Sequence, residues 1–558
     1  MKKIIILLIF VLLVGCSSSS NDNSLDIEHI DWSEYDQLIE KANIEQNIDK
    51  RNEMLHKAED MIIDSGAIIP LFNSIESYLL KSDVSGIYID SLANLQYSHI
   101  YSPGKNSLNL GIILEVPNAD PQQQLLQDVS YLWNGIGATL LTYDENDNLI
   151  CSLADHYDVS EDGLVYTFYL KDNLKWSDGK ELTANDFVYS WKRAADPINT
   201  CEAADFIKIV KGFPYNLAVE ASSDGKIFTV TLNEPCVYFA SLTAYNSFGP
   251  LRQDVIESAP GYKDSSGKIS NPFAWSIDGV PISCGPYVLE SWKHNESMVL
   301  KKNPYYYDAD SIKTETLNLM LSSDSTVKYA AYVSGDISLL VDAIPTDILE
   351  TLYDNPEYHY SESLSTSWIF FSTTSDIFKG MSAEDAKTFR KAIGYCIDRV
   401  FISQILSNPL DTVSSSIVPE RTLDGSGHYY GEYGNKKYPY EHGYYPDRPD
   451  LDKAREMLES IGYEFDNSGK LKNPINLEYL TNSGAGNEAV ATCIQADLAQ
   501  IGINLTVSTL EWSVFLGERK NGNYELCRGS WSLDFNDPFS ILSIFSTDNP
   551  NNDSQLGR

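Results

Sequence analysis

The chain has 558 residues, of which 43% are hydrophobic and 11% aromatic, so it is long enough to bury more than one hydrophobic core. Two or three domains are therefore expected. Its formal net charge of −38 argues against nucleic acid as a partner, because the phosphate backbone would repel it. The acidic balance indicates a well-solvated surface, with a preference for cationic ligands as a second interpretation.

The first residues combine two lysines, a short apolar run and Leu13-Val14-Gly15-Cys16. The run is too short to span a bilayer comfortably and is typical of a signal peptide; a plain cleaved signal or a membrane anchor is the alternative. Leu-Val-Gly-Cys resembles a lipobox, whose cysteine becomes the lipidated first residue of the mature protein. We expect residues 1–16 to be a lipoprotein signal peptide. Residues 17–30 would then be a tether that holds the protein, through lipid on Cys16, at the outer face of a membrane.

The rest of the chain mixes helical and extended patterns without an internal repeat. Apolar residues recur at helical spacing in 33–42, 50–63, 326–334, 385–406, 450–461 and 487–501. Strand-like runs occupy 65–72, 107–114, 166–170 and 503–508. This alternation predicts an α/β protein with mixed sheets. Residues 425–449, dense in Tyr, Gly and Pro, are expected to form a loop on the surface or beside a ligand.

Cysteines and histidines give no metal or disulfide pattern. Seven scattered cysteines remain besides Cys16, and neither C-x-x-C nor H-x-x-H spacing occurs. We expect most of these cysteines to be buried small apolar residues, and we predict no metal and no cofactor.

The clearest local signal is Leu153 to Arg193, which includes "LKWSDGKELTANDFVYSWKR". A strand over 166–170 lies between Asp-Gly turns, and Thr183-Ala-Asn-Asp186 predicts a capping box at a helix start. This segment closely resembles the signature of bacterial extracellular solute-binding protein family 5, the oligopeptide-binding proteins of ABC importers. Further resemblances are 115–121, 302–306, 334–337, 389–393 with 398–399, and 528–538. They imply a two-lobed periplasmic-binding-protein-like α/β fold with a hinge between the lobes, and no enzymatic activity.

One departure from the family is large. A segment that starts at Tyr35, is clearest over residues 35–73 and ends near Tyr101 resembles the family's C-terminal segment. Here it precedes everything else. We interpret this order as a circular permutation, with the former termini joined at 101–107; a shuffled or misassembled gene is the alternative. Residues 76–328 would then form lobe I, with an extra subdomain at about 130–260. Residues 31–75 and 329–558 would form lobe II.

The motif "RGSWSLDFNDP" at 528–538 places the carboxylate of Asp534 between Trp531 and Phe535. In the family, the acid of this motif pairs with the α-ammonium of a bound peptide, and the resemblance gives that role to Asp534. A charge-assisted hydrogen bond in a closed cleft would satisfy both ions. The alternatives are that Asp534 caps a helix starting at 537–539, or pairs with Arg528.

The resemblance implies further ligand-binding residues. Arg528 and Arg519 match cleft arginines; the alternative for each is an intramolecular salt bridge. Trp531 and Trp512 match tryptophans that wall side-chain pockets; the alternative for each is an ordinary core position. Tyr332 matches a cleft tyrosine near the hinge. The remaining candidates are Ser530 and Ser532, beside which a peptide would pair as an added strand, and Glu115, in the segment that resembles the family's first strand.

Three positions differ from members that take longer peptides: Ser483-Gly-Ala-Gly486 replaces a histidine region, and Ser74 and Ala203 replace tyrosines. Ligand length is therefore left open. The implied mechanism is capture of an oligopeptide by hinge closure, followed by delivery to an ABC permease with its ATPase subunits. We expect the protein to be a monomer.

Other functions stay open at this point. A sugar, a metal chelate or haem could occupy the same fold, and a peptide-sensing receptor would have the same sequence features. A hydrolase has little support, because Cys527 and Ser532 have no accompanying histidine and no G-x-S-x-G motif is present.

Overall fold

The computed structural model describes residues 27–558 except 29, 91, 93, 114, 124–126, 278, 280, 323, 342–343, 346–347, 407–411 and 432–442. The predicted signal peptide, Cys16 and most of the tether lie outside the described residues, as does the centre of the loop 425–449. Within the described ranges, no helix has the length and hydrophobicity needed to cross a membrane.

The main sheet has ten strands among the described residues, in the order β11-β12-β13-β4-β14-β1-β15-β18-β16-β17. β4 pairs in parallel with β13 and β14, and β16 pairs in parallel with β17 and β18, while the other neighbours are antiparallel. The predicted mixed α/β fold is confirmed. The strands of this sheet are β1 (Ile68–Leu80), β4 (Ser107–Ile113), β11 (Tyr287–Lys293), β12 (Ser297–Lys302), β13 (Thr316–Leu321), β14 (Leu339–Val341), β15 (Tyr358–Phe371), β16 (Ile475–Asn482), β17 (Ile503–Leu510) and β18 (Leu526–Ser532).

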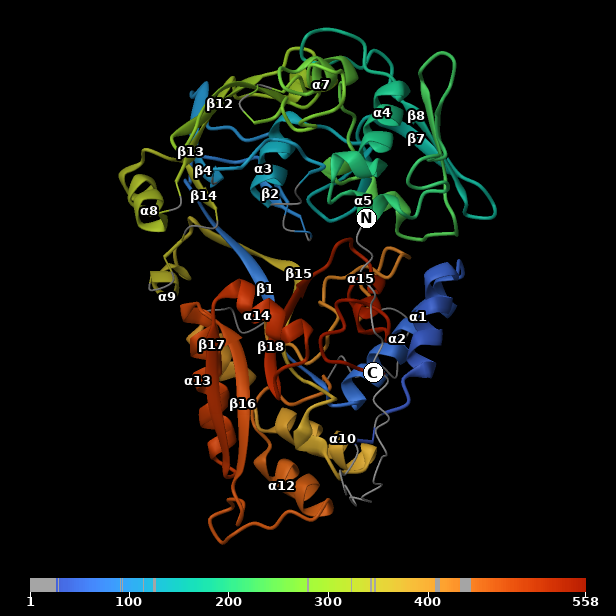
Figure 1. Cartoon of the computed structure of the whole chain (residues 1–558). Coiled ribbons are helices and arrows are strands. Elements are labelled where there is room, and N and C mark those ends of the chain that lie inside the picture. The colour runs from blue at the N-terminus through green and yellow to red at the C-terminus, as the bar shows by residue number, and fades with distance from the viewer. Residues whose placement is uncertain are drawn as a thin grey trace, which may run out of the picture.

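Two lobes lie on either side of the strand pair β1 and β15, which runs through both (Figure 1). The first lobe contains β4 and β11–β14, and the second contains β16–β18 with the helices below them (Figure 1). The register of β1 against β15 shifts between Pro70 and Phe72 and again between Asn73 and Ile75. These irregularities bend the strand pair where the chain passes between the lobes.

Helices cover both lobes. In the first lobe these are α3 (Gln127–Ile136), α7 (Gln253–Ser258), α8 (Ser325–Ser334) and α9 (Leu349–Leu352). In the second lobe they are α1 (Ser33–Ile44), α2 (Ile48–Asp64), α10 (Ala383–Tyr395), α11 (Arg399–Ile405), α12 (Leu451–Ser460), α13 (Ala485–Ala499), α14 (Trp512–Lys520) and α15 (Phe539–Leu542).

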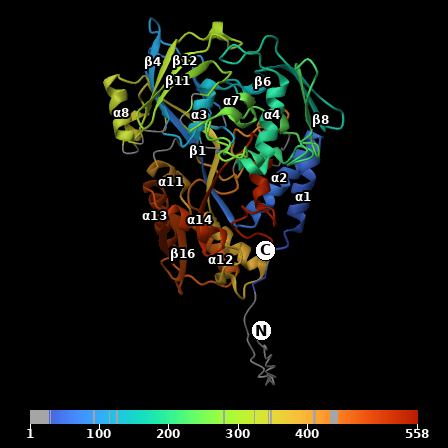
Figure 2. The same cartoon turned by 45° about the horizontal axis from the view of Figure 1, so that its top comes forward.

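A subdomain of the first lobe is built on a four-stranded sheet of order β7-β8-β10-β9. α4 lies against this sheet, as Figure 2 shows, and the predicted capping box holds its start: the Thr183 N–H donates to the Asp186 carboxylate at 2.8 Å. The elements are β5 (Leu141–Tyr143), β6 (Leu149–Cys151), β7 (Ala154–Val159), β8 (Val165–Leu170), α4 (Ala184–Ala195), α5 (Ala204–Ile207), β9 (Val219–Ala221), β10 (Ile227–Thr231) and α6 (Phe239–Leu242), with the hairpin β2 (Tyr88–Ile89) and β3 (Leu95–Gln96) outside it.

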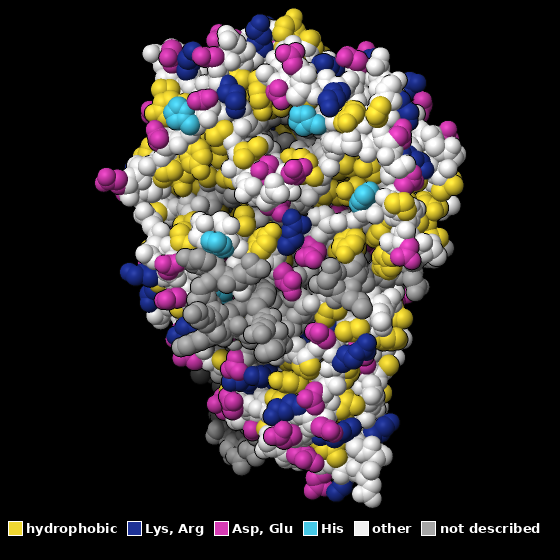
Figure 3. Space-filling view, turned by 180° about the vertical axis from the view of Figure 1, so that it is seen from behind, with side chains coloured by type: hydrophobic (Ala, Val, Ile, Leu, Met, Phe, Trp, Pro, Cys, Tyr) yellow, Lys and Arg dark blue, Asp and Glu magenta, His cyan; other side chains and the backbone are white. Residues whose placement is uncertain are grey.

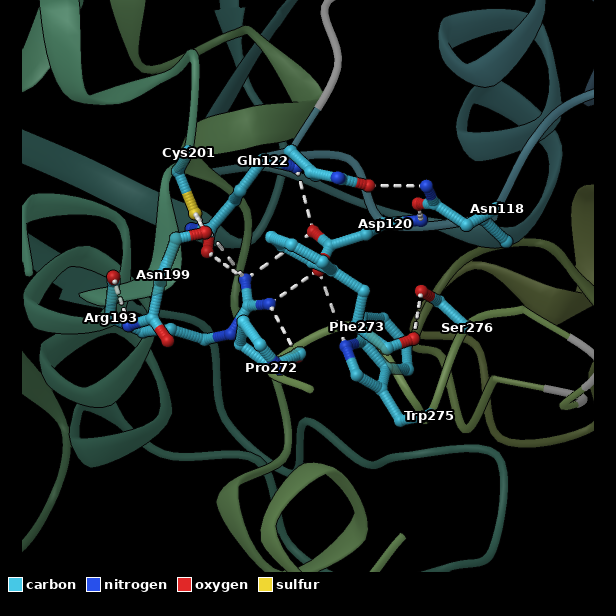
Figure 4. A network of polar contacts seen from close by, with 12 residues as sticks. Asn118, Asp120, Gln122, Arg193, Asn199, Cys201, Pro272, Phe273, Trp275 and Ser276 are labelled. Carbon is cyan, nitrogen blue, oxygen red and sulfur yellow. Dashed lines mark hydrogen bonds and ion pairs between the residues drawn. The ribbon is translucent and has the colours of Figure 1, made fainter. Parts of the chain in front are cut away.

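A buried ion pair ties this subdomain to the loop after β4. Arg193 of α4 pairs with Asp120, and both side chains are almost completely buried. Arg193 also donates to Gln122 at 2.7 Å and to the Pro272 carbonyl at 3.2 Å, while the indole of Trp275 donates to Asp120 at 3.3 Å (Figure 4). Because both charges are met by several partners, this network is structural.

The expected helix over 385–406 is wrong as a single element. It is two helices, α10 and α11, because Asp398 caps a new helix start by accepting from the Phe401 N–H at 2.8 Å. The strand predicted at 65–72 begins at Ile68 and continues to Leu80.

The front of the chain packs against its far end. The indole of Trp32 donates to the Phe545 carbonyl at 3.0 Å, and Tyr35 donates to the Leu542 carbonyl. Leu556 lies in the same buried cluster as these two aromatics. On the face shown in Figure 3, acidic, basic and apolar side chains are interspersed, so the net charge is not gathered there in one patch.

Candidate ligand-binding site

A cavity of about 250 Å³ lies between the subdomain and the second lobe. One wall comes from the subdomain segment 205–242 and the other from residues 531–551, which are the end of β18 and the segment that follows it. The lining residues are Asp205, Phe206, Ile209, Tyr238, Leu242, Trp531, Asp534, Phe535, Phe539, Ser540, Ser543, Ile544, Asn549 and Asn551. Aromatic and aliphatic side chains dominate, and among the described lining residues both charged ones are carboxylates, with no lysine or arginine. This lining suits a ligand with a cationic group.

Asp534 lies two residues after the end of β18, and its main chain is fixed on both sides. Its N–H donates to Ser540 Oγ at 2.8 Å, and its carbonyl oxygen accepts from the Tyr245 hydroxyl. The carboxylate itself has no hydrogen-bond or ion-pair partner among the described residues. Burial raises the pKa of Asp534 to about 6. An ionised carboxylate in this position is destabilised by desolvation and would be stabilised by a cation entering the cavity.

The two alternatives for Asp534 fail in the described part of the chain. The N-cap of α15 is Pro538, and it is Asp537 that accepts from the Phe539 N–H, at 2.8 Å. Asp537 also forms a buried bidentate ion pair with Arg51 at 2.8 Å. Arg528 is directed to Asn482 Oδ1 at 2.7 Å and Ser530 Oγ at 3.1 Å. Asp537 and Arg528 therefore have partners other than Asp534.

Aromatic rings wall the cavity. Phe535 stacks on Tyr238 of the subdomain with 3.8 Å between ring centroids and 8° between planes. Trp531 lies on the other side, and its indole N–H is buried without an acceptor among the residues described. Such walls exclude water and strengthen a charge interaction inside.

The strand leading to Asp534 has a free edge. β18 pairs with β15 along Leu526–Ser532, whereas its pairing with β16 stops at Cys527. No described strand therefore pairs with the second edge of residues 528–532. Ser530 and Ser532 lie in this open part, with the Ser532 side chain exposed. Unpaired N–H and C=O groups there can accept an added strand.

Two further candidates lie outside the cavity. Arg519 forms an ion pair with Asp553 at 2.7 Å, the alternative considered for it from the sequence. Trp512 begins α14, is 49% exposed and stacks on Phe515. Neither residue lines the cavity of Asp534.

Tyr332 and Glu115 also lie elsewhere. Tyr332 is buried on α8, donates to Glu357 at 2.8 Å and lies under the Lys81 ammonium. Figure 1 shows α8 at the left edge of the molecule, away from α15. Glu115 accepts from the Asn295 N–H at 2.6 Å and contacts His294 at 2.7 Å, in the turn between β11 and β12. The structure therefore brings Asp534 and Trp531 into one cavity, with Ser530, Ser532 and Arg528 on the strand beside it, and leaves these two residues apart.

Comparison with known proteins decides the family. The profile described as bacterial extracellular solute-binding proteins, family 5 Middle, matches residues 148–553, which include both walls of the cavity. The chain belongs to this family. The resemblance inferred from the motifs is thereby confirmed, and so is the two-lobed periplasmic-binding-protein-like fold.

Individual family 5 relatives are distant in sequence. The oligopeptide-binding protein OppA of Bacillus subtilis is 28% identical over 414 residues, 72% of this chain and 70% of that protein. A dipeptide-binding protein of Lactococcus lactis is 28% identical over 439 residues, 75% of this chain and 74% of the relative.

Solved structures of the family agree on the fold. The unliganded open form of the periplasmic murein tripeptide binding protein MppA has a TM-score of 0.64 at 22% identity, covering 82% of this chain and 84% of that one. A periplasmic oligopeptide-binding protein of Borrelia burgdorferi has a TM-score of 0.56 at 26% identity, covering 80% and 84%.

This family 5 chain has a second, larger cavity that the sequence did not indicate. It measures about 560 Å³ and shares Tyr238 with the first, while Asn536 and Asp537 line it instead of Asp534 and Phe535. The stacked rings of Tyr238 and Phe535 thus stand between the two spaces.

Sequence reasoning also missed Tyr238, Tyr245 and the wall formed by Asp205 and Phe206. No spacing pattern connects these residues to position 534; the only available signal was that α5 follows the family signature directly. For the nucleophile hypothesis, burial raises the pKa of the Cys527 thiol, which is the opposite of activation. No group of three potential metal ligands is found among the described residues.

Proposed function

We propose that the protein captures oligopeptides between its lobes, with the peptide's α-ammonium held by Asp534. The observation that carries this proposal is the partly buried carboxylate of Asp534, which has no partner among the described residues and lines a cavity without basic side chains in a family 5 protein. The printed names of the relatives, which are oligopeptide-, dipeptide- and murein-peptide-binding proteins, support the same ligand class.

Among its described lining residues, the cavity has no cation to meet the carboxylate of Asp534. A carboxylate buried among aromatic rings is costly unless a cation meets it, and the described residues offer none. A terminal ammonium would provide the charge and up to three N–H donors. The free edge of residues 528–532 would pair with the peptide main chain, which makes binding tolerant of side-chain identity.

Capture would proceed by hinge motion. We assign lobe I to residues 76–328, as expected from the sequence, together with residues 329–352, because β14 in this segment pairs with β4. Lobe II then comprises residues 31–75 and the rest of 329–558, with the hinge in β1 and β15; β14 also pairs with β1 at this boundary. After closure, a monomeric binding protein would deliver the peptide to an ABC permease with its ATPase subunits and would catalyse no reaction. We further propose that it is extracytoplasmic and held at the outer face of the cell membrane by lipid on Cys16.

The permuted order of the chain is part of this proposal. The contacts of Trp32, Tyr35 and Leu556 bring the front segment against the far end, as expected if these two segments were once continuous. Residues 102–105 form a tight polar turn with an isolated bridge between Ser102 and Lys105, which suits a junction between former termini. The match to OppA of Bacillus subtilis leaves similar shares of both chains unmatched, 72% and 70% being covered.

The test of the proposed function uses Asp534→Asn, which keeps the shape of the side chain and removes its charge. We expect a loss of roughly 100-fold or more in affinity for tri-alanine, because a buried charge pair is broken, and little change for N-acetyl-tri-alanine. Isothermal titration calorimetry measures both. Equal losses for the two peptides would show that the side chain is structural, and mass spectrometry of co-purified ligands gives an independent check of the ligand class.

A further inference from the structure

The main chain of Asp534 is held from two different lobes. Ser540, which lies on α15 in the second lobe, accepts the Asp534 N–H at 2.8 Å. Tyr245, in the subdomain of the first lobe, donates its hydroxyl hydrogen to the Asp534 carbonyl. Only the second of these bonds crosses the gap between the lobes, so it exists only when the lobes are together.

Tyr245 is suited to hold this residue without competing for its charge. Desolvation raises the pKa of the Tyr245 hydroxyl well above its ordinary value, so it stays a neutral donor while the protein is folded. The bond uses the main-chain carbonyl, which leaves both carboxylate oxygens for a ligand. A lysine or arginine at this position would instead neutralise the carboxylate.

The ring of Tyr245 is itself fixed by the opposite wall of the cavity. It lies 6.0 Å from the ring of Phe206, which lines the cavity from α5. A shift of the subdomain relative to the second lobe therefore moves Phe206 and Tyr245 together and separates the Tyr245 hydroxyl from the carbonyl of residue 534.

We infer that Tyr245 is a positioning residue for ligand binding: its hydroxyl, bonded to the carbonyl of Asp534, links the approach of the two lobes to the orientation of the carboxylate. This inference rests on the proposed function, because it assigns Tyr245 a role only if Asp534 binds the ammonium. It distinguishes Tyr245 from Tyr238, which contributes a stacked ring and a wall of the cavity.

The experiment compares Tyr245→Phe with a matched control, Tyr166→Phe. Tyr166 is a buried tyrosine of the same subdomain whose hydroxyl donates to the Cys236 carbonyl at 2.9 Å, entirely within that subdomain. Both variants lose one hydroxyl that donates to a main-chain carbonyl, but only Tyr245→Phe loses a bond between lobes.

We expect Tyr245→Phe to weaken tri-alanine binding about 3- to 10-fold, mainly through faster dissociation, and to leave N-acetyl-tri-alanine within about twofold. Tyr166→Phe should lower the melting temperature without changing the ratio of the two affinities. Calorimetry gives the affinities and stopped-flow fluorescence gives the dissociation rates.

If Tyr245→Phe weakened the binding of both peptides equally, or weakened neither, the inference about Tyr245 would be overturned. The proposed function would still stand if Asp534→Asn weakened the binding of tri-alanine more than that of N-acetyl-tri-alanine. If Asp534→Asn does not discriminate, the proposed function itself fails. Should Tyr245→Phe not fold, the pair Ser540→Ala and Ser540→Thr tests the other main-chain bond. Ser540→Ala should reduce the affinity ratio and Ser540→Thr should preserve it, and an unchanged ratio in Ser540→Ala would also contradict positioning through the main chain.

Discussion

At the scale of single residues, burial without a partner among the described residues is what sets Asp534 apart from the other acid of its motif. Asp537, three residues on, is more deeply buried but is met by both guanidinium nitrogens of Arg51. The protein thus satisfies one carboxylate fully and leaves the other with only its own main chain anchored. Such a difference between neighbouring acids indicates a binding role for the unsatisfied one.

Under the proposed role of Asp534, its raised pKa would make ligand binding depend on pH. Binding of an ammonium requires the ionised carboxylate, whose pKa is about 6 in the unliganded protein. We expect the affinity for tri-alanine to fall up to tenfold per pH unit below about 6, and to fall again above about 8 as the peptide amine loses its proton. Calorimetry between pH 5 and 9 measures this profile. N-acetyl-tri-alanine should show neither decline, and a flat profile for the free peptide would contradict the role of Asp534.

A second acid gives a stability effect that is independent of the ligand. Burial raises the pKa of Glu59 on α2 to about 7, although its Oε1 accepts from Ser416 Oγ and from the N–H groups of Ile417 and Val418. Because the folded-state pKa lies above the unfolded one, the Glu59 contribution to the free energy of unfolding is present below about pH 4.5 and lost as pH rises through 7.

Glu59→Gln should therefore remove part of the decline in the free energy of unfolding as pH rises. Relative to the wild type, the variant should gain up to about 3 kcal/mol in the free energy of unfolding between pH 5 and 8. Urea unfolding at both pH values measures the change. The exposed acid Glu40 provides the control: Glu40→Gln should show no such trend, and an identical trend would rule out Glu59 as the source.

At the scale of elements, the buried Arg51–Asp537 pair joins α2 to the segment that leads into α15. The Arg51 side chain is 0% exposed and that of Asp537 3%. We expect Arg51→Ala to lower the free energy of unfolding by about 3–5 kcal/mol, because it leaves a buried charge without its partner. Lys57→Ala on the same helix breaks an exposed pair with Glu34 and should cost less than about 1 kcal/mol. Similar costs for both variants in urea unfolding would contradict this difference.

Local patterns predicted most elements, since they depend on residues close in sequence. The helices α1, α2, α8, α12 and α13 lie where apolar spacing placed them, and the Thr183 capping box is present. The split at Asp398 was missed because helical spacing of apolar residues continues through this position. That spacing does not show whether the aspartate stays inside one helix or caps the start of a second one. The extension of β1 to Leu80 depends on its pairing with β15 and β14, which no local pattern encodes.

At the scale of the whole molecule, the lobes are held together by contacts besides those at Asp534. Arg421 of the second lobe forms an ion pair with Asp147, in the turn between β5 and β6 of the subdomain. It also donates to Ser361 Oγ at 3.1 Å and to the Glu362 carbonyl at 3.3 Å. These contacts favour the arrangement of the lobes seen in the structure, in which the second lobe touches the subdomain.

We expect Arg421→Ala to increase the radius of gyration of the ligand-free protein and to weaken peptide binding about threefold, because closure then has to be driven by the peptide alone. Small-angle X-ray scattering and calorimetry measure these effects, and saturating peptide should restore the compact form. The control, Arg448→Ala, removes an exposed pair with Asp398 within the second lobe and should change neither. A radius unchanged by Arg421→Ala would show that this pair does not hold the lobes.

The site was predictable in part. The motif resemblance singled out Asp534 and Trp531, because their neighbours in sequence are themselves part of the motif. The opposite wall, with Asp205 and Phe206, and the nearby donor Tyr245 come from a segment that only the packing of two lobes brings near position 534. Tyr332 and Glu115 were grouped with the site by resemblance alone, and their hydrogen bonds in the structure are with other partners.

The division of the cavity between residues 205–242 and 531–551 bears on when the protein can first hold a ligand. A partly synthesised chain that has not yet released its last segment from the ribosome has one wall and no acid at 534. Under the proposed role of Asp534, ligand binding therefore has to wait until residues 531–551 have been made and have packed against the subdomain.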